Sequence, residues 1–138
     1  MIGALIAKRK AMAALEAMNR GDLENYLHGW ADDGTFVFPG NVEGASGTHI
    51  GKDAIGRWMQ HFFEQFPSRS FNVKHIAVSN LFDLTGNNVV AIHWELDLTN
   101  RKGVKTHGTG VTLVTIRNGK ATRAQDFIFD VGDLFGAE

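Results

Sequence analysis

The sequence predicts an α+β domain in which helices pack on one face of a curled antiparallel sheet. Two observations lead to this prediction. Apolar residues recur at helical spacing before Pro67, and apolar and polar residues alternate after it. No internal repeat or Pro- or Ser-rich linker divides the 138 residues. Residues 1–138 are therefore expected to form a single domain.

Three helices are predicted before Pro67. The first ends at the stop signal Asn19-Arg20-Gly21, and Asp22 can cap a short second helix. The third opens at Gly51-Lys52-Asp53, and its many aromatic residues require a large apolar surface to lie against. The apolar stripes of the three helices are Leu5, Met12, Leu15 and Met18; Leu23, Tyr26, Leu27 and Trp30; and Ile55, Trp58, Met59, Phe62 and Phe63.

The remaining segments predict strands and the turns between them. A short strand, Thr35–Phe38, ends at Pro39-Gly40, and the glycine-rich segment 41–50 is either a mobile flap or a plain connection. Asn118-Gly119 is the strongest hairpin signal of the chain. Longer alternating strands are predicted near Phe71–Ser79, Asn88–Leu98, Lys105–Ile116 and Ala121–Asp130.

Composition restricts the classes of function. The 14 Lys and Arg against 15 Asp and Glu give a net charge of −1, whereas a phosphate-neutralising protein needs a basic surplus, so no nucleic-acid partner is expected. The absence of cysteine excludes disulfides and fits a reducing cytoplasm. No secretory signal is expected, because Lys8, Arg9 and Lys10 follow the short apolar start instead of preceding a longer apolar run. No membrane association is expected either, because no apolar run approaches the roughly 20 residues that span a bilayer. Without a phosphate loop or a histidine pair at helical spacing, no cofactor and no metal are expected.

The order of these elements and several local motifs resemble the SnoaL-like branch of the nuclear-transport-factor-2-like superfamily, over roughly residues 11–135. The resemblance implies three N-terminal helices and a curved antiparallel sheet that form a cone-shaped pocket. It implies no single reaction, because this fold carries isomerases, cyclases, hydrolases, dehydratases and non-catalytic domains. The motifs are Asn19-Arg20-Gly21-Asp22, Trp30-Ala31-Asp32-Asp33, Gly51-Lys52-Asp53-Ala54-Ile55, and Asn118-Gly119-Lys120 followed by Asp126-Phe127-Ile128-Phe129-Asp130.

Better-understood relatives differ where they carry chemistry. The general-base Asp of ketosteroid isomerases corresponds to Phe38, which cannot accept a proton. The catalytic group of limonene-epoxide-hydrolase-like enzymes resembles His93, Glu95 and Asp126, but the Tyr and Asn that position water there correspond to Phe36 and Phe38. In SnoaL-like polyketide cyclases the base on a late strand resembles Asp126. The resemblance therefore points most consistently to Asp126.

The strand Asn88–Leu98 can be oriented in two ways. Its apolar face can pack into the core while its polar face meets water. Alternatively, the polar face lines the pocket, and the apolar face packs against a second copy of the chain, which predicts a homodimer. The functional hypothesis uses this second orientation. The apolar face carries Val90, Ile92, Trp94, Leu96 and Leu98, and the polar face carries Val89, Ala91, His93, Glu95 and Asp97.

In that second orientation, Glu95 and Asp126 share the pocket with His93. Burial among aromatic rings raises the pKa of a carboxyl group and a neighbouring cation lowers it, so two such groups can serve as acid and base. We expect Asp126 to be the general base, with His93 and Glu95 as orienting groups or a proton relay. The residues expected to contact the substrate are Trp30, Phe36, Phe38, Trp58 and Phe62, with His75 and His107 as further candidates.

Two classes of function remain open. The first is a cofactor-independent enzyme that transfers protons on a hydrophobic small molecule, as an isomerase, cyclase, dehydratase or hydrolase does. The second is a non-catalytic ligand-binding or dimerisation module of the same fold. Phe36 and Phe38 favour the module because they replace polar side chains of relatives. The enzyme requires a carboxyl group inside the pocket, whereas the module needs only apolar walls.

Overall fold

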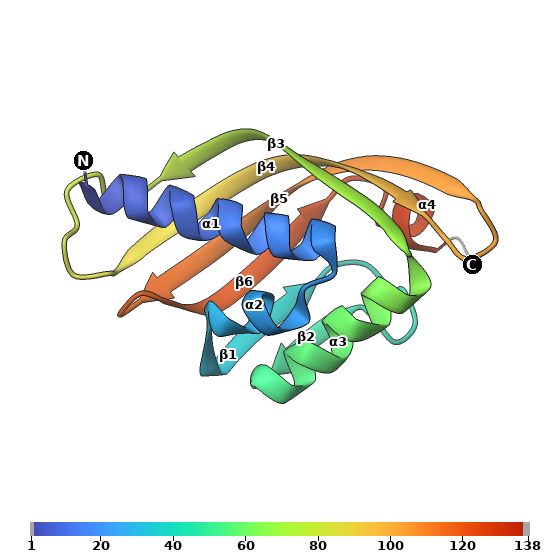
Figure 1. The fold of residues 1–138 in the computed structure, drawn as a ribbon, viewed down its shortest axis with the longest axis horizontal. Coiled ribbons are helices and arrows are strands. Elements are labelled where there is room, and N and C mark those ends of the chain that lie inside the picture. Colours follow the sequence, from blue (N-terminus) through green and yellow to red (C-terminus); the bar gives the residue numbers. More distant parts are fainter. Residues whose placement is uncertain (1, 137–138) are drawn as a thin grey trace.

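The computed structural model describes residues 2–136 and shows an α+β fold (Figure 1). The predicted fold, a curved sheet preceded by helices, is confirmed. No helix in the described residues is long and apolar enough to cross a membrane. The elements are α1 Ile2–Arg20, α2 Leu23–His28, β1 Trp30–Phe38, β2 Gly47–Ile50, α3 Lys52–Gln65, β3 Ser68–Val78, β4 Asn88–Thr99, β5 Lys105–Arg117, β6 Lys120–Ile128 and α4 Val131–Phe135.

Several elements differ from the sequence prediction. Trp30 begins β1 instead of ending the second helix, which stops at His28. The short elements β2 and α4 are additions to the predicted set. The glycine-rich segment before β2 is a connection held by hydrogen bonds, not an open flap. The Ser46 hydroxyl donates to the carbonyl of Pro39 at 2.7 Å and accepts from the backbone N–H of Val42 at 2.8 Å.

The six strands form one sheet in the order β2-β1-β6-β5-β4-β3. Neighbouring strands are antiparallel except β1 and β6, which run parallel. The parallel pair brings the first long strand beside the last one, for example Val37 opposite Gln125. The N-terminal and C-terminal segments of the chain therefore build the same part of the sheet.

The helices cover one face of this sheet. Figure 1 shows α1 crossing in front of β4 and β5, with α2 and α3 beside β1 and β2. The side chains on the predicted apolar face of β4 are buried in the hydrophobic core, each 3% exposed or less. The prediction that Val90, Ile92, Trp94, Leu96 and Leu98 pack against a second copy is therefore wrong. Burying each of these side chains stabilises the fold by about 1.5–3 kcal/mol, whereas turning Glu95 and Asp97 inward would desolvate charges.

Arg69 joins the ends of the two helices that frame the interior. Its Nε donates to the carbonyl of Met18 at the end of α1, at 2.9 Å, and its Nη1 donates to the carbonyl of Phe66 after α3, at 2.6 Å. The guanidinium carbon also lies 4.5 Å from the ring centroid of Phe63. A planar group with several donors can satisfy these separate acceptors at once. Arg69 thus fixes where α1 ends relative to α3.

Candidate functional site

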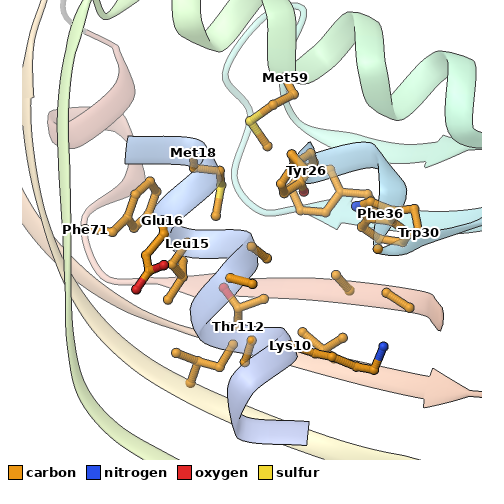
Figure 2. Close-up of a pocket in the computed structure, with 18 of the residues that line it drawn as sticks. Lys10, Leu15, Glu16, Met18, Tyr26, Trp30, Phe36, Met59, Phe71 and Thr112 are labelled. Carbon is orange, nitrogen blue, oxygen red and sulfur yellow. The ribbon is translucent and has the colours of Figure 1, made fainter. Parts of the chain in front are cut away.

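A cavity of about 390 Å³ is lined by residues from the helices and from the inner face of the sheet. Figure 2 shows Leu15 and Met18 from α1, Tyr26 from α2 and Met59 from α3 around it, with Thr112 from the sheet. Most of its lining is apolar. This size and composition are typical of sites that bind a small organic molecule.

The predicted aromatic residues all line this cavity: Trp30, Phe36, Phe38, Trp58 and Phe62. The Trp58 ring lies edge-on to Phe36, with centroids 4.8 Å apart, and 5.0 Å from Phe38. Its indole N–H donates to the carbonyl of Ala45 at 3.0 Å, so the ring has a fixed orientation. These contacts hold a rigid aromatic wall.

Asp126 on β6 is the partly buried carboxyl group of the cavity. The hydroxyl of Thr112, its register partner on β5, donates to Asp126 Oδ1 at 2.6 Å. The Thr112 oxygen in turn accepts the indole N–H of Trp94 at 2.9 Å, which leaves the hydroxyl hydrogen for Asp126. Asp126 Oδ2 makes no hydrogen bond with any described residue. One oxygen is therefore held and the other can exchange a proton with a bound molecule.

Burial raises the pKa of Asp126 to about 7, although the hydrogen bond from Thr112 acts to lower it. Removal from water disfavours the carboxylate more than a single donor favours it. Near neutral pH this carboxyl group is present in both forms. A group with such a pKa can accept and return a proton in one cycle.

Tyr26 adds a second polar group to the cavity. Burial raises the pKa of its phenol, a hydrogen bond from Trp30 acts to lower it, and the charge of Asp126 raises it further. The hydroxyl therefore remains protonated and can donate. The sequence placed Tyr26 only on an apolar helix stripe and did not single out Thr112. Thr112 could be recognised only by its position opposite Asp126, and this position is known only once the register of β5 and β6 is known.

Glu95 and His93 lie on the opposite face of the sheet. Glu95 Oε2 is 3.4 Å from Lys74 Nζ, and the Glu95 side chain is 39% exposed. His93 Nδ1 is 3.0 Å from His75 Nδ1, and His93 Nε2 is 3.1 Å from the Thr109 hydroxyl. Because Trp94 faces the cavity, its neighbours along the strand must face outward. The prediction that Glu95 and His93 share the pocket with Asp126 is wrong.

The other two histidine candidates are also outside the cavity. His75 is exposed beside His93, and the exposed His107 has its Nδ1 2.7 Å from Asp97 Oδ1. Neither lines the cavity, so their predicted contact with a substrate there is wrong. Among residues 2–136, no three histidine, cysteine or carboxylate side chains gather closely enough to hold a metal ion.

Gly110 allows Trp94 to reach Thr112. Gly110 and Trp94 are register partners on β5 and β4. A Cβ atom at Gly110 would lie 2.8 Å from the six-membered ring of Trp94, closer than real Cβ contacts allow. The indole can therefore cross over β5 only above a glycine. This packing places the indole N–H against the Thr112 hydroxyl.

Solved structures with this fold come from several sources. One is a nuclear-transport-factor-2-like protein of unknown function from Burkholderia pseudomallei, with 18% identity, coverage of 99% of this chain and 100% of that chain, and a TM-score of 0.81. A Bacillus subtilis protein provisionally named an isomerase has 21% identity, coverage of 100% and 98%, and a TM-score of 0.80. TerC, co-crystallised with polyporic acid, has 22% identity, coverage of 92% and 94%, and a TM-score of 0.77.

These identities are low, and the structures show a shared fold alone. No curated protein is similar in sequence. The SnoaL-like domain family, in contrast, matches residues 11–124. This segment runs from the first helix to the last strand and includes most of the cavity. The chain therefore belongs to the SnoaL-like domain family.

Proposed function

We propose that the protein is a cofactor-independent enzyme that transfers a proton on a hydrophobic small molecule, with Asp126 as the acid and base. The observation that carries this proposal is the state of the Asp126 carboxyl group. It is partly buried in an apolar cavity, one oxygen accepts from Thr112 at 2.6 Å, and burial raises its pKa to about 7. Acid–base catalysis is most efficient when the pKa lies near the working pH.

In the proposed reaction, Asp126 Oδ2 removes a proton from a carbon next to a carbonyl group. The electron pair of that C–H bond stays on the substrate as an enolate, and the Tyr26 hydroxyl donates a hydrogen bond to the enolate oxygen. Where the substrate carries a carbon–carbon double bond conjugated with this enolate, the neutral Asp126 then returns the proton to the far carbon of that double bond, which completes an isomerisation. Ring closure or loss of a leaving group from the same enolate gives a cyclase or a dehydratase. The TerC and Bacillus subtilis structures support a small-molecule site in this fold.

A non-catalytic ligand-binding module is the second candidate. It is favoured by Phe36 and Phe38, which are 4% and 2% exposed and place rings where relatives carry polar side chains. Glu95 and His93 also lie away from the cavity, so Asp126 has no second ionisable partner from β4. Binding would then rest on the apolar walls alone.

Hydrogen exchange on a simple ketone separates the two candidates. We would incubate the protein with 2-tetralone, an enolisable bicyclic ketone, in deuterated water and follow loss of the α-proton signal by NMR. Wild-type protein should accelerate exchange, and Asp126→Asn should lower the rate by about 10²–10⁴-fold, the usual contribution of a general base. Glu95→Gln, on the outer face, should exchange like wild type. Binding of 2-tetralone with no acceleration by wild type would favour the module.

We further propose that the protein acts as a cytoplasmic homodimer that associates through the outer face of the sheet. This face exposes Leu113 by 38%, Phe127 by 52% and Phe129 by 75%. Apolar side chains grouped on one face are typical of an association surface. Sedimentation velocity should give a dimer for wild type and a monomer for Phe127→Glu. A wild-type monomer at micromolar concentration would contradict the proposed association.

A further inference from the structure

The cavity has an opening between α1, the end of α2 and the turn that joins β5 to β6. Exposed residues from these segments belong to its lining. Many of the side chains at this opening are small, so a bound molecule can extend through it toward solvent. They are Ala13, Ala14, Gly29, Gly119 and Ala121.

Lys10 is the cation at this opening. It projects from α1 along the edge of the cavity (Figure 2), and its ammonium group lies beside Gly119. Within residues 2–136 Lys10 forms no ion pair and no hydrogen bond. The neighbouring Lys120 is engaged, since its Nζ donates to the carbonyl of His28 at 2.6 Å. Lys10 therefore has a free ammonium group at the edge of an apolar cavity.

The other charged groups of the cavity lining are arranged differently. Arg20 Nη2 lies 3.5 Å from Asp22 Oδ2 and is thus already neutralised. Glu16 points to the side of α1 that faces Phe71, away from Lys10 (Figure 2). An anionic group in the cavity would be attracted at the Lys10 end and repelled at the Glu16 end. The cavity lining is therefore electrostatically polarised across α1, with the cation at the opening and the anion on the side that faces Phe71.

We propose that Lys10 binds an anionic group of the substrate, so that the cavity selects hydrophobic ring compounds that carry a carboxylate or a comparable anionic oxygen group at one end. The inference rests on the proposed function only in taking this cavity as the substrate site. Apolar walls next to the ammonium lower the local dielectric constant and strengthen its attraction for an anion. The anionic end would remain at the opening, and the ring system would extend toward Asp126.

Two fluorescent probes with the same ring skeleton test this selection. 8-Anilino-1-naphthalenesulfonate carries a sulfonate, and N-phenyl-1-naphthylamine is its neutral counterpart. We would titrate both into wild-type protein, Lys10→Met, which keeps the aliphatic chain but removes the charge, and Lys10→Arg, which keeps the charge. Lys8→Met is the matched control, because Lys8 is an exposed α1 lysine that does not line the cavity. Ala13→Trp, which fills the opening, tests whether the probes enter there.

Lys10→Met should weaken binding of the sulfonate by about fivefold at low salt, as expected for a partly exposed ion pair, and leave binding of the neutral probe unchanged. Lys10→Arg should retain the preference, Lys8→Met should behave as wild type, and Ala13→Trp should lose both probes. Raising NaCl from about 20 mM to about 500 mM should remove most of the difference, because salt screens the attraction.

The inference is overturned if Lys10→Met weakens both probes equally or neither, if Lys8→Met has the same effect, or if Ala13→Trp still binds both probes. Asp126→Asn separates this inference from the proposed function. If that variant retains ketone exchange while Lys10→Met loses the sulfonate preference, the proton-transfer proposal fails and the anion site stands. The reverse pattern refutes the anion site alone.

Discussion

Replacing Asp126 with Asn should change how the stability of the protein depends on pH. The pKa of Asp126 rises from the ordinary value of 3.8 to about 7 because of burial, so the folded protein holds this proton more tightly than the unfolded chain. The ionised carboxylate therefore destabilises the fold. Its penalty is absent below the unfolded pKa, grows as the pH rises, and becomes constant above the folded pKa.

The size of this effect follows from the pKa values. At about 1.4 kcal/mol per pH unit, the rise from 3.8 to about 7 corresponds to about 4 kcal/mol at high pH. About 2.5 kcal/mol of this penalty develops between about pH 5 and about pH 8. The amide introduced by Asp126→Asn cannot ionise, and its oxygen can still accept from Thr112. The variant should gain that amount of stability relative to wild type across this interval.

Urea unfolding followed by tryptophan fluorescence measures the difference. Wild type and Asp126→Asn would be compared at about pH 5 and at about pH 8. Taking the difference between the two proteins at each pH cancels the titration of all other groups. Glu95→Gln, on the outer face, should stay within about 0.5 kcal/mol of wild type at both. If the stability difference between wild type and Asp126→Asn is the same at both pH values, the carboxyl group is ordinary, and the reasoning behind the proposed acid and base is refuted.

Three further predictions concern the groups that support this site. Thr112→Val should raise the pKa of Asp126 further, because the hydroxyl lowers it, while Thr112→Ser should restore it; carboxyl ¹³C NMR titration measures both. Gly110→Ala should lower the free energy of unfolding by about 1–3 kcal/mol, because the added methyl group overpacks against Trp94. Gly132→Ala, where the new Cβ meets no neighbour within 4 Å, is the control and should be near neutral. Urea unfolding measures both variants. Arg69→Lys should cost about 1–3 kcal/mol in thermal unfolding, because one ammonium cannot serve the carbonyls of both Met18 and Phe66; an unchanged midpoint would show that the guanidinium does not join the helices.

The sequence was sufficient for the fold and for the aromatic wall. Trp58 and Phe62 repeat at helical spacing, and Phe36 and Phe38 alternate on a strand, so each pair had to share one side of its element. Resemblance to the family then indicated which sides face each other. Asp126 was also singled out by resemblance, and it lines the cavity.

The orientation of β4 could not be decided from its own residues. Strict alternation produces an apolar and a polar face, and either face can meet a pocket. The deciding partner is α1, whose buried Ala7, Ala11 and Leu15 belong to the same core as Trp94 and Leu96. This contact joins segments that are distant in the chain, and no local pattern reports it. Because this contact is not visible in the sequence, His93 and Glu95 were wrongly predicted to face the pocket.

The register of the last hairpin was hidden for a different reason. Arg117 pairs with Lys120 across the Asn118-Gly119 turn, but an irregularity between Thr115 and Ile116 shifts all later pairs by one residue. Uninterrupted counting would place Thr112 opposite Gln125, whereas Thr112 pairs with Asp126. A bulge of this kind leaves an extra residue on one strand. The hydroxyl that holds the carboxyl group is therefore visible only in the folded protein.

The parallel pairing of β1 with β6 affects how the protein is made. A ribosome completes β1 long before it reaches β6. Phe36 therefore remains unpaired on this edge of β1 until Ala124, its partner in β6, has been synthesised. Closing such a distant pair costs chain entropy and slows folding. During synthesis the rings of β1 would remain accessible to chaperones and to other nascent chains. Because Asp126 lies on β6, the cavity would close and receive its carboxyl group in the same step, when β6 pairs with β1.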